Sequence, residues 1–119
     1  MQRERWSGGI DSVGSTTLAN ALSQTVYGCA IACCGLAGGA DLPATVLPHI
    51  LRAVTLIGID SVIATRQQRL SAWARLTRDM DKGKLDSMTT VEPMSSLPQL
   101  AEDIVAGKIR GRAVIDVNG

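Results

Sequence analysis

A chain of 119 residues is long enough for one domain with a modest hydrophobic core. Its formal net charge is +1 and its basic residues are scattered, which excludes the charged surface expected of a protein that binds nucleic acid or anionic lipid. No apolar run can cross a bilayer and the start of the chain has no signal-peptide pattern, so we expect no membrane partner and a cytoplasmic location.

Short apolar runs alternate with amphipathic stretches along the chain. Aromatic residues make up only 3% of it, so the core is expected to consist of Val, Leu, Ile and Ala, as in α/β proteins with buried parallel strands. After an irregular start at 1–8, the pattern predicts a strand at 9–14, a helix at 15–27, a strand at 28–36, a short helix at about 45–52, a strand at 54–62 and a helix at 65–81. A loop at 82–84 follows. The remaining predicted elements are an extended segment at 86–94, a helix at 95–108 and a strand at 111–117.

The order of these elements predicts the fold class. A β-α-β-α-β-α series followed by β-α-β is typical of an α/β protein whose parallel strands are joined by right-handed crossovers, with helices covering the sheet. The chain contains no G-x-G-x-x-G turn. We therefore expect the C-terminal half of a Rossmann-type parallel sheet at 9–82, a weak boundary at 81–84, and a β-α-β segment at 83–119.

Local signals mark the helices. The first helix has Ser15 or Thr16 available as its N-cap, and Gly107 fits the C-cap of the last one. In the helix at 65–81 the apolar residues share one face, which is predicted to point inward. The residues of that face are Leu70, Trp73, Ala74 and Leu76.

Three cysteines, Cys29, Cys33 and Cys34, lie close together in the second predicted strand. A closed zinc site normally takes four ligands in spaced pairs, whereas adjacent residues of a strand point to opposite faces. Cys29 and Cys33 share a face but lie about 13 Å apart along it, from the rise per residue of a strand. We therefore expect buried core thiols that bind no metal and form no disulfide with one another.

Glycines and short polar residues follow three of the predicted strands. They occur in the sequences IDSVG at 10–14, CGLAGG at 34–39 and GIDSV at 58–62. In open α/β sheets, ligands bind outside the carboxyl ends of the strands, and Asp, Ser and Gly can hydrogen-bond a ribose or an amide. This pattern indicates a ligand-binding rim, although ordinary turn chemistry explains it as well.

Four segments resemble one known family in the same order and at the same spacing. They are ACCGLAGG at 32–39, LPATVLPHILR at 42–52, LIGIDSV at 56–62 and IRGRAVIDV at 109–117. The family is the acrylyl-CoA reductase, or quinone oxidoreductase-like, branch of the medium-chain dehydrogenase/reductase superfamily. The resemblance runs from Trp6 to Val117 and implies a zinc-independent enzyme that uses NADPH to reduce the C=C bond of acrylyl-CoA or a similar small-molecule substrate. It also implies a C-terminal fragment, inactive alone, whose residues 83–119 return to the catalytic domain.

The resemblance further implies which residues bind the cofactor. Residues 11–14 would face its adenosine side, 34–36 would run beside its nicotinamide half, and 59–61 would lie near the nicotinamide ring. The cofactor-binding residues expected on this basis are Ser12, Val13, Gly14, Cys34, Gly35, Leu36, Ile59, Asp60 and Ser61. The catalytic residues are expected in the part of the family that has no counterpart in this chain. Gly35→Val in an intact enzyme is expected to weaken cofactor binding more than folding.

Two further polar residues are expected to be structural. Asp60 has no second carboxylate near it in sequence, so a hydrogen-bonding role is expected rather than acid–base catalysis. His49 stands where the family pattern suggests an aromatic ring, which indicates a packing residue.

The resemblance also implies a homodimer. In the family the strand matching Val54–Asp60 lies at the outer edge of the sheet, where its unpaired N–H and C=O groups can pair with a second copy. Two alternatives to the reductase remain. One is a stand-alone α/β module that binds a nucleotide or a protein without catalysis, and the other is an NADPH:quinone oxidoreductase.

Overall fold

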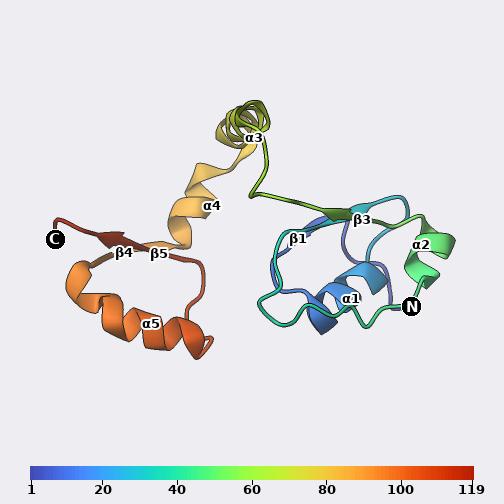
Figure 1. The fold of residues 1–119 in the computed structure, drawn as a ribbon, viewed down its shortest axis with the longest axis horizontal. Helices are drawn as coiled ribbons and strands as arrows, with labels where there is room; N and C mark the ends of the chain where they lie inside the picture. Colours follow the sequence, from blue (N-terminus) through green and yellow to red (C-terminus); the bar gives the residue numbers. More distant parts are fainter. The chain divides into compact units, whose positions relative to one another are not determined.

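A computed structural model describes residues 1–119 (Figure 1). The chain divides into two compact units, Met1–Thr65, called the first unit, and Arg66–Gly119, called the second unit. The second unit begins with the longest helix of the chain, α3 (Arg66–Asp79). No helix in the structure has the length and apolar character that crossing a membrane requires.

The first unit is a three-stranded parallel sheet with helical crossovers, as the order of elements predicts. Its elements are β1 (Gly9–Asp11), α1 (Ser15–Ser23), β2 (Ala30–Cys33), α2 (Leu47–Arg52) and β3 (Thr55–Gly58). The strands lie in the order β1-β2-β3, so β1 and β3 are both edge strands. Ile10, Ala32 and Ile57 are aligned across the three strands. The α/β class is therefore confirmed.

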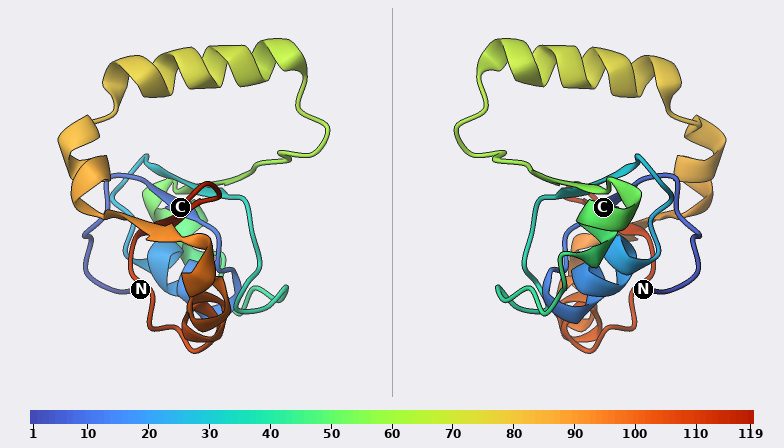
Figure 2. Two further views of the ribbon diagram at one scale, coloured as in Figure 1. Left: turned by 90° about the vertical axis from the view of Figure 1, so that its left-hand side faces the viewer. Right: turned by 90° about the vertical axis from the view of Figure 1, so that its right-hand side faces the viewer.

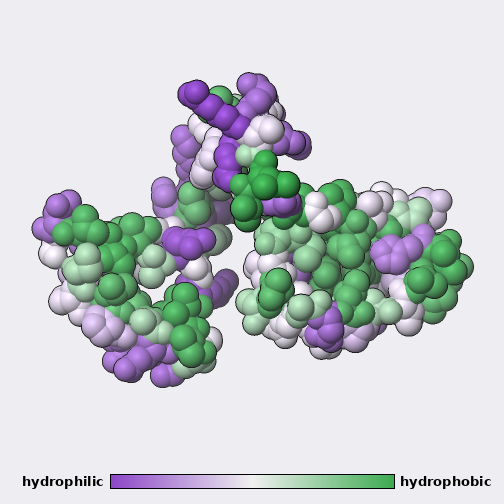
Figure 3. All heavy atoms as spheres, viewed as in Figure 1, coloured by the Kyte–Doolittle hydropathy of each residue, from purple (hydrophilic) through white to green (hydrophobic).

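The core of the first unit lies between the sheet and α1, which covers one face of the sheet (Figures 1 and 2). Its buried apolar residues are Leu18, Leu22, Ile31 and Val54. Because side chains alternate along a strand, the row that contains Ile10 and Ile57 points to the other face. Ile10 is 84% exposed. Hydrophobic residues, green in Figure 3, also cover much of the side of the first unit that this view shows. The first unit thus has one packed face and one apolar face without a cover.

The start of α1 differs from the prediction. Neither Ser15 nor Thr16 caps it: the N-cap is Gly14, at φ 74°, and no side chain caps the first turn. Instead the buried carboxylate of Asp11 accepts a hydrogen bond of 2.8 Å from the Gly14 N–H. The left-handed φ of Gly14 suits a residue without a Cβ atom. The turn is therefore held by a residue of the preceding strand.

The N-terminal residues are tied to the end of α1, which stops at Ser23 and not at residue 27. Trp6 forms a parallel bridge with Thr25, and the Val26 N–H donates to the Trp6 carbonyl at 2.9 Å. Arg52 donates to the carbonyl oxygens of Ser23 and Gln2 and pairs with Glu4. Arg52 thereby satisfies a carbonyl group of the last turn of α1, which has no partner within the helix.

The second unit contains a two-stranded parallel sheet. Its elements are α3 (Arg66–Asp79), α4 (Lys82–Ser87), β4 (Thr89–Pro93), a short 3₁₀ helix (Met94–Ser96), α5 (Leu97–Val105) and β5 (Arg112–Asp116). The strands β4 and β5 pair directly, and α5 lies along one side of them (Figure 1). This is the β-α-β segment that the sequence predicts.

Two helix ends in the second unit test the local signals. The C-cap of α5 is Ala106, one residue before the predicted Gly107. Gly107 follows it with a left-handed φ of 69°, and the N–H groups of Gly107 and Lys108 donate to the carbonyl oxygens of Ile104 and Asp103, so this glycine does mark the end of the helix. The loop predicted at 82–84 is wrong, because α4 begins there. The Asp81 side chain caps it by accepting from the Lys84 N–H at 3.1 Å.

The inward face predicted for α3 is wrong for the structure described. No residue of α3 is buried, and Leu70 and Trp73 are 53% and 65% exposed. An amphipathic pattern shows that a face can be buried, but burial also needs a partner surface.

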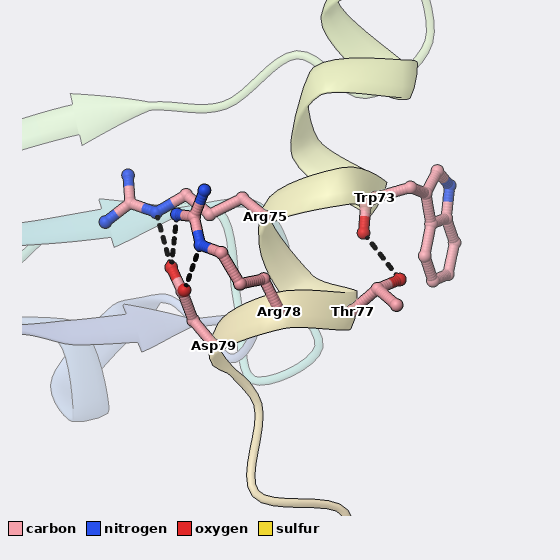
Figure 4. Close-up of polar contacts among 5 residues, drawn as sticks. All are labelled: Trp73, Arg75, Thr77, Arg78 and Asp79. Atoms are coloured by element: carbon pink, nitrogen blue, oxygen red, sulfur yellow. Dashed lines mark hydrogen bonds and ion pairs between the residues drawn. The ribbon is translucent and has the colours of Figure 1, made fainter.

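The polar side chains of α3 pair with one another. Figure 4 shows Arg75 and Arg78 converging on Asp79, away from Trp73. The hydrogen bond from Arg78 lowers the pKa of the Asp79 carboxyl below its usual value.

Candidate functional site

The loops that follow β1 and β2 are joined by backbone hydrogen bonds. The Cys34 N–H donates to the Asp11 carbonyl at 2.8 Å, and the Gly38 N–H donates to the Val13 carbonyl at 2.7 Å. A parallel bridge between Gly14 and Gly39 continues the pairing. The two loops therefore continue the parallel pairing of β1 and β2 beyond the ends of these strands and lie side by side.

These two loops and the end of β3 line an open hollow of about 660 Å³ at the carboxyl ends of the three strands. Six of the nine predicted cofactor-binding residues line it, namely Gly14, Cys34, Gly35, Leu36, Ile59 and Asp60. Ser12, Val13 and Ser61 lie outside the lining. The carbonyl groups of Ser12 and Val13 accept hydrogen bonds from the second loop, so both residues hold the loops together.

Seven further residues line the hollow. Gly39 and Gly58 belong to the strand-end segments 34–39 and 58–62, which predict a ligand-binding rim, whereas five residues were not predicted: Leu18, Cys33, Ala40, Asp41 and Leu42. The run from Ala40 to Leu42 directly continues the glycine-rich segment, so its position in sequence was an available signal. Leu18 could not be found this way, because it enters the lining from α1.

The loop glycines are needed for loop packing. A Cβ atom at Gly35 would lie 2.6 Å from the carbonyl oxygen of Ser12, and one at Gly14 would lie 2.5 Å from that of Gly39. At Gly39 it would lie 2.9 Å from the side chain of Asp41. These contacts are shorter than van der Waals separation. The expectation that Gly35→Val acts mainly on cofactor binding is therefore revised, since its first effect falls on the loops.

The hollow has an acidic and apolar character. Asp41 and Asp60 line it, and no Lys, Arg or His does. Asp60 Oδ1 accepts hydrogen bonds from the N–H groups of Val62 at 2.8 Å and Ile63 at 3.2 Å, which is the structural role expected of it. No side chain of the hollow could neutralise a phosphate group. The lining therefore suits an apolar or cationic group that carries hydroxyl donors.

Comparison with known proteins identifies relatives that cover almost the whole chain. No protein-family model matches it. It is 48% identical over 118 residues to "Acrylyl-CoA reductase AcuI" of Ruegeria pomeroyi and 39% identical over 118 residues to "Putative quinone oxidoreductase YhfP" of Bacillus subtilis. These alignments cover 99% and 97% of the chain. The chain is homologous to proteins named acrylyl-CoA reductase and quinone oxidoreductase.

A solved structure supports the same conclusion for the fold. The crystal structure of Escherichia coli YhdH with bound NADPH matches 98% of the chain with a TM-score of 0.83 and 41% sequence identity. The matched region is 36% of that protein and 36% of the Ruegeria reductase. The chain thus spans about a third of the length of these relatives. The family resemblance and the Rossmann-type fold are confirmed.

The three cysteines of the chain differ in their surroundings. Cys33 packs against the core, and its Sγ lies 3.9 Å from Asp11 Oδ2. Cys29 is half-buried just before β2, whereas Cys34 is exposed in the loop after it. The prediction of three core thiols is therefore wrong for Cys34, because β2 ends one residue earlier. All three are free thiols in the structure.

His49 holds the turn between α2 and β3. Its Nδ1 atom lies 2.7 Å from the carbonyl oxygen of Val54, which accepts a hydrogen bond from the ring. Ala53, between them, has a left-handed φ of 49°. His49 lies outside the hollow, as expected of a structural residue.

Proposed function

We propose that this chain is the C-terminal part of an NADPH-dependent reductase of acrylyl-CoA or a similar activated enoyl compound. In this proposal residues 9–82 complete the dinucleotide-binding domain and residues 83–119 return to the catalytic domain. The hollow at the ends of three parallel strands carries the proposal, because ligands of open α/β sheets bind there. The name of the Ruegeria relative and the NADPH bound in the structure of Escherichia coli YhdH support it.

The lining fits part of the cofactor. Bound NADPH supplies the hydride, so the protein mainly positions the ring and excludes water. The exposed side chains of Leu36 and Ile59 supply apolar surface to the hollow. The carboxylates of Asp41 and Asp60 are acceptors suited to ribose hydroxyls. No zinc takes part in this proposal, and the catalytic residues are assigned to the remainder of the enzyme.

The chain by itself is expected to show no reductase activity. It has no G-x-G-x-x-G turn to present N–H groups to the pyrophosphate, and no Lys, Arg or His lines its hollow. The assay follows NADPH absorbance with acrylyl-CoA, using the chain alone and a chimera in which it replaces the matching segment of the Ruegeria reductase. We expect turnover by the chimera only.

Three results would decide between the proposals. NADPH oxidation by the chain alone contradicts the assignment as part of a larger enzyme. A folded chimera that binds no NADPH supports the stand-alone module. A quinone in place of acrylyl-CoA tests the second activity, which the name of the Bacillus relative favours. The unmodified Ruegeria protein is the control for assay conditions.

We also propose that the enzyme forms a homodimer through β3, an edge strand. Thr55 on β3 is exposed, whereas Leu56 packs against the core, so Thr55→Lys charges the edge without disturbing the fold. Light scattering of the chimera is expected to give a dimer, and the Thr55→Lys variant a monomer. Thr16→Lys, on an exposed position of α1, is the control and should remain dimeric. A monomeric parent chimera at micromolar concentration contradicts the proposal.

A further inference from the structure

Gly58 is the glycine of the hollow that loop packing does not explain. It is the last residue of β3 and pairs with Cys33 of β2. A Cβ atom added there would meet no atom within 4 Å, and its φ lies outside the left-handed region. The fold therefore has room for a side chain at this position, in contrast to Gly14, Gly35 and Gly39.

A glycine at such a position has a cost. Glycine in a strand loses more backbone entropy on folding than other residues and has no side chain to pack. Glycine in a strand often marks a bulge, a tight bend, or a site where a ligand or another backbone approaches closely. The pairing of β3 with β2 is regular up to Gly58, and no backbone lies within 4 Å of a Cβ atom placed there, so the approach of a ligand in the hollow is the reason that remains.

The chemistry of the wall limits what could lie against Gly58. Asp60 and Asp41 give the hollow negative charge, while Leu18, Leu36 and Ile59 give it apolar surface. A phosphate would meet two carboxylates and no cation, which is unfavourable. An uncharged or cationic flat ring with an attached ribose meets apolar surface and two hydroxyl acceptors instead.

We propose that Gly58 is a specificity-determining residue, whose missing side chain admits the ring-and-ribose end of a nicotinamide nucleotide against the end of β3. The inference rests on the proposed cofactor function. It places the nicotinamide ring in the space next to Gly58 that a side chain would otherwise fill. A side chain at Gly58 then fills this space while leaving the fold intact.

The test uses the 119-residue chain, labelled with ¹⁵N, and reduced nicotinamide mononucleotide as the probe. We expect saturable shifts of backbone amides at the end of β3. Overpacking predicts that Gly58→Ala raises the dissociation constant about threefold and Gly58→Val about tenfold or more. Neither variant should lower the melting temperature. Gly83→Ala, on the exposed helix α4, is the matched control and should leave binding unchanged.

The outcomes separate this inference from the proposed function. Equal affinity for the probe in the wild type and both Gly58 variants overturns the role of Gly58 and leaves the cofactor hollow standing. No binding by the wild type contradicts the cofactor hollow, and the inference falls with it. Adenosine 2′,5′-bisphosphate tests the ring assignment, which is overturned if this ligand shifts the same amides as strongly. Should Gly58→Val fail to fold, Gly58→Ala decides.

Discussion

Leu22→Ala is expected to lower the free energy of unfolding of the first unit by about 3 kcal/mol. Leu22 is completely buried, between α1 and the sheet, and only four apolar residues form this core. Removing three carbon atoms leaves a cavity that so small a core cannot refill without losing contacts elsewhere. Urea denaturation followed by circular dichroism measures the change, which amounts to a large part of the stability of a small domain.

A leucine of another helix provides the control. Leu70 lies on α3 and is 53% exposed, so Leu70→Ala removes the same atoms without opening a cavity. We expect it to change the free energy of unfolding by about 0.5 kcal/mol or less. Equal effects of the two substitutions would show that the core does not lie where the structure places it.

Gly35→Val is expected to destabilise the first unit by about 3 kcal/mol, or to prevent its folding. The new Cβ atom would lie 2.6 Å from the carbonyl oxygen of Ser12, and the two methyl groups would add to the overlap. Relief requires the loops after β1 and β2 to separate, which breaks their hydrogen bonds. The melting temperature of the variant should therefore fall before any ligand is added.

The comparison with Gly58→Val isolates the cause. Both positions line the hollow, and both substitutions add the same atoms, but only Gly35 has backbone in the way. Gly58→Val should keep the melting temperature of the wild type or raise it, because valine suits a strand better than glycine. A Gly35→Val variant as stable as the wild type refutes the close packing of the loops.

Features that depend on neighbouring residues along the chain were predictable from the amino-acid pattern. Alternating strand and helix patterns predicted the parallel α/β fold, because short connections constrain the handedness and order of its strands. Gly107 marked the end of α5, since a left-handed residue there needs no tertiary contact. The strand-end residues Cys34, Gly35 and Asp60 were found for the same reason, and all line the hollow.

Features that depend on residues far apart in sequence became clear from the packing of the folded chain. Leu70 and Trp73 share an apolar face, but burial needs a partner surface that periodicity does not supply. Gly35 and Gly58 both follow the pattern of glycine at a strand end. They differ because Ser12 occupies the space next to Gly35, whereas no atom occupies the space next to Gly58. The sequence shows that a glycine leaves space beside the backbone. The residues that surround it in the fold determine whether that space is filled by protein or left open for a ligand.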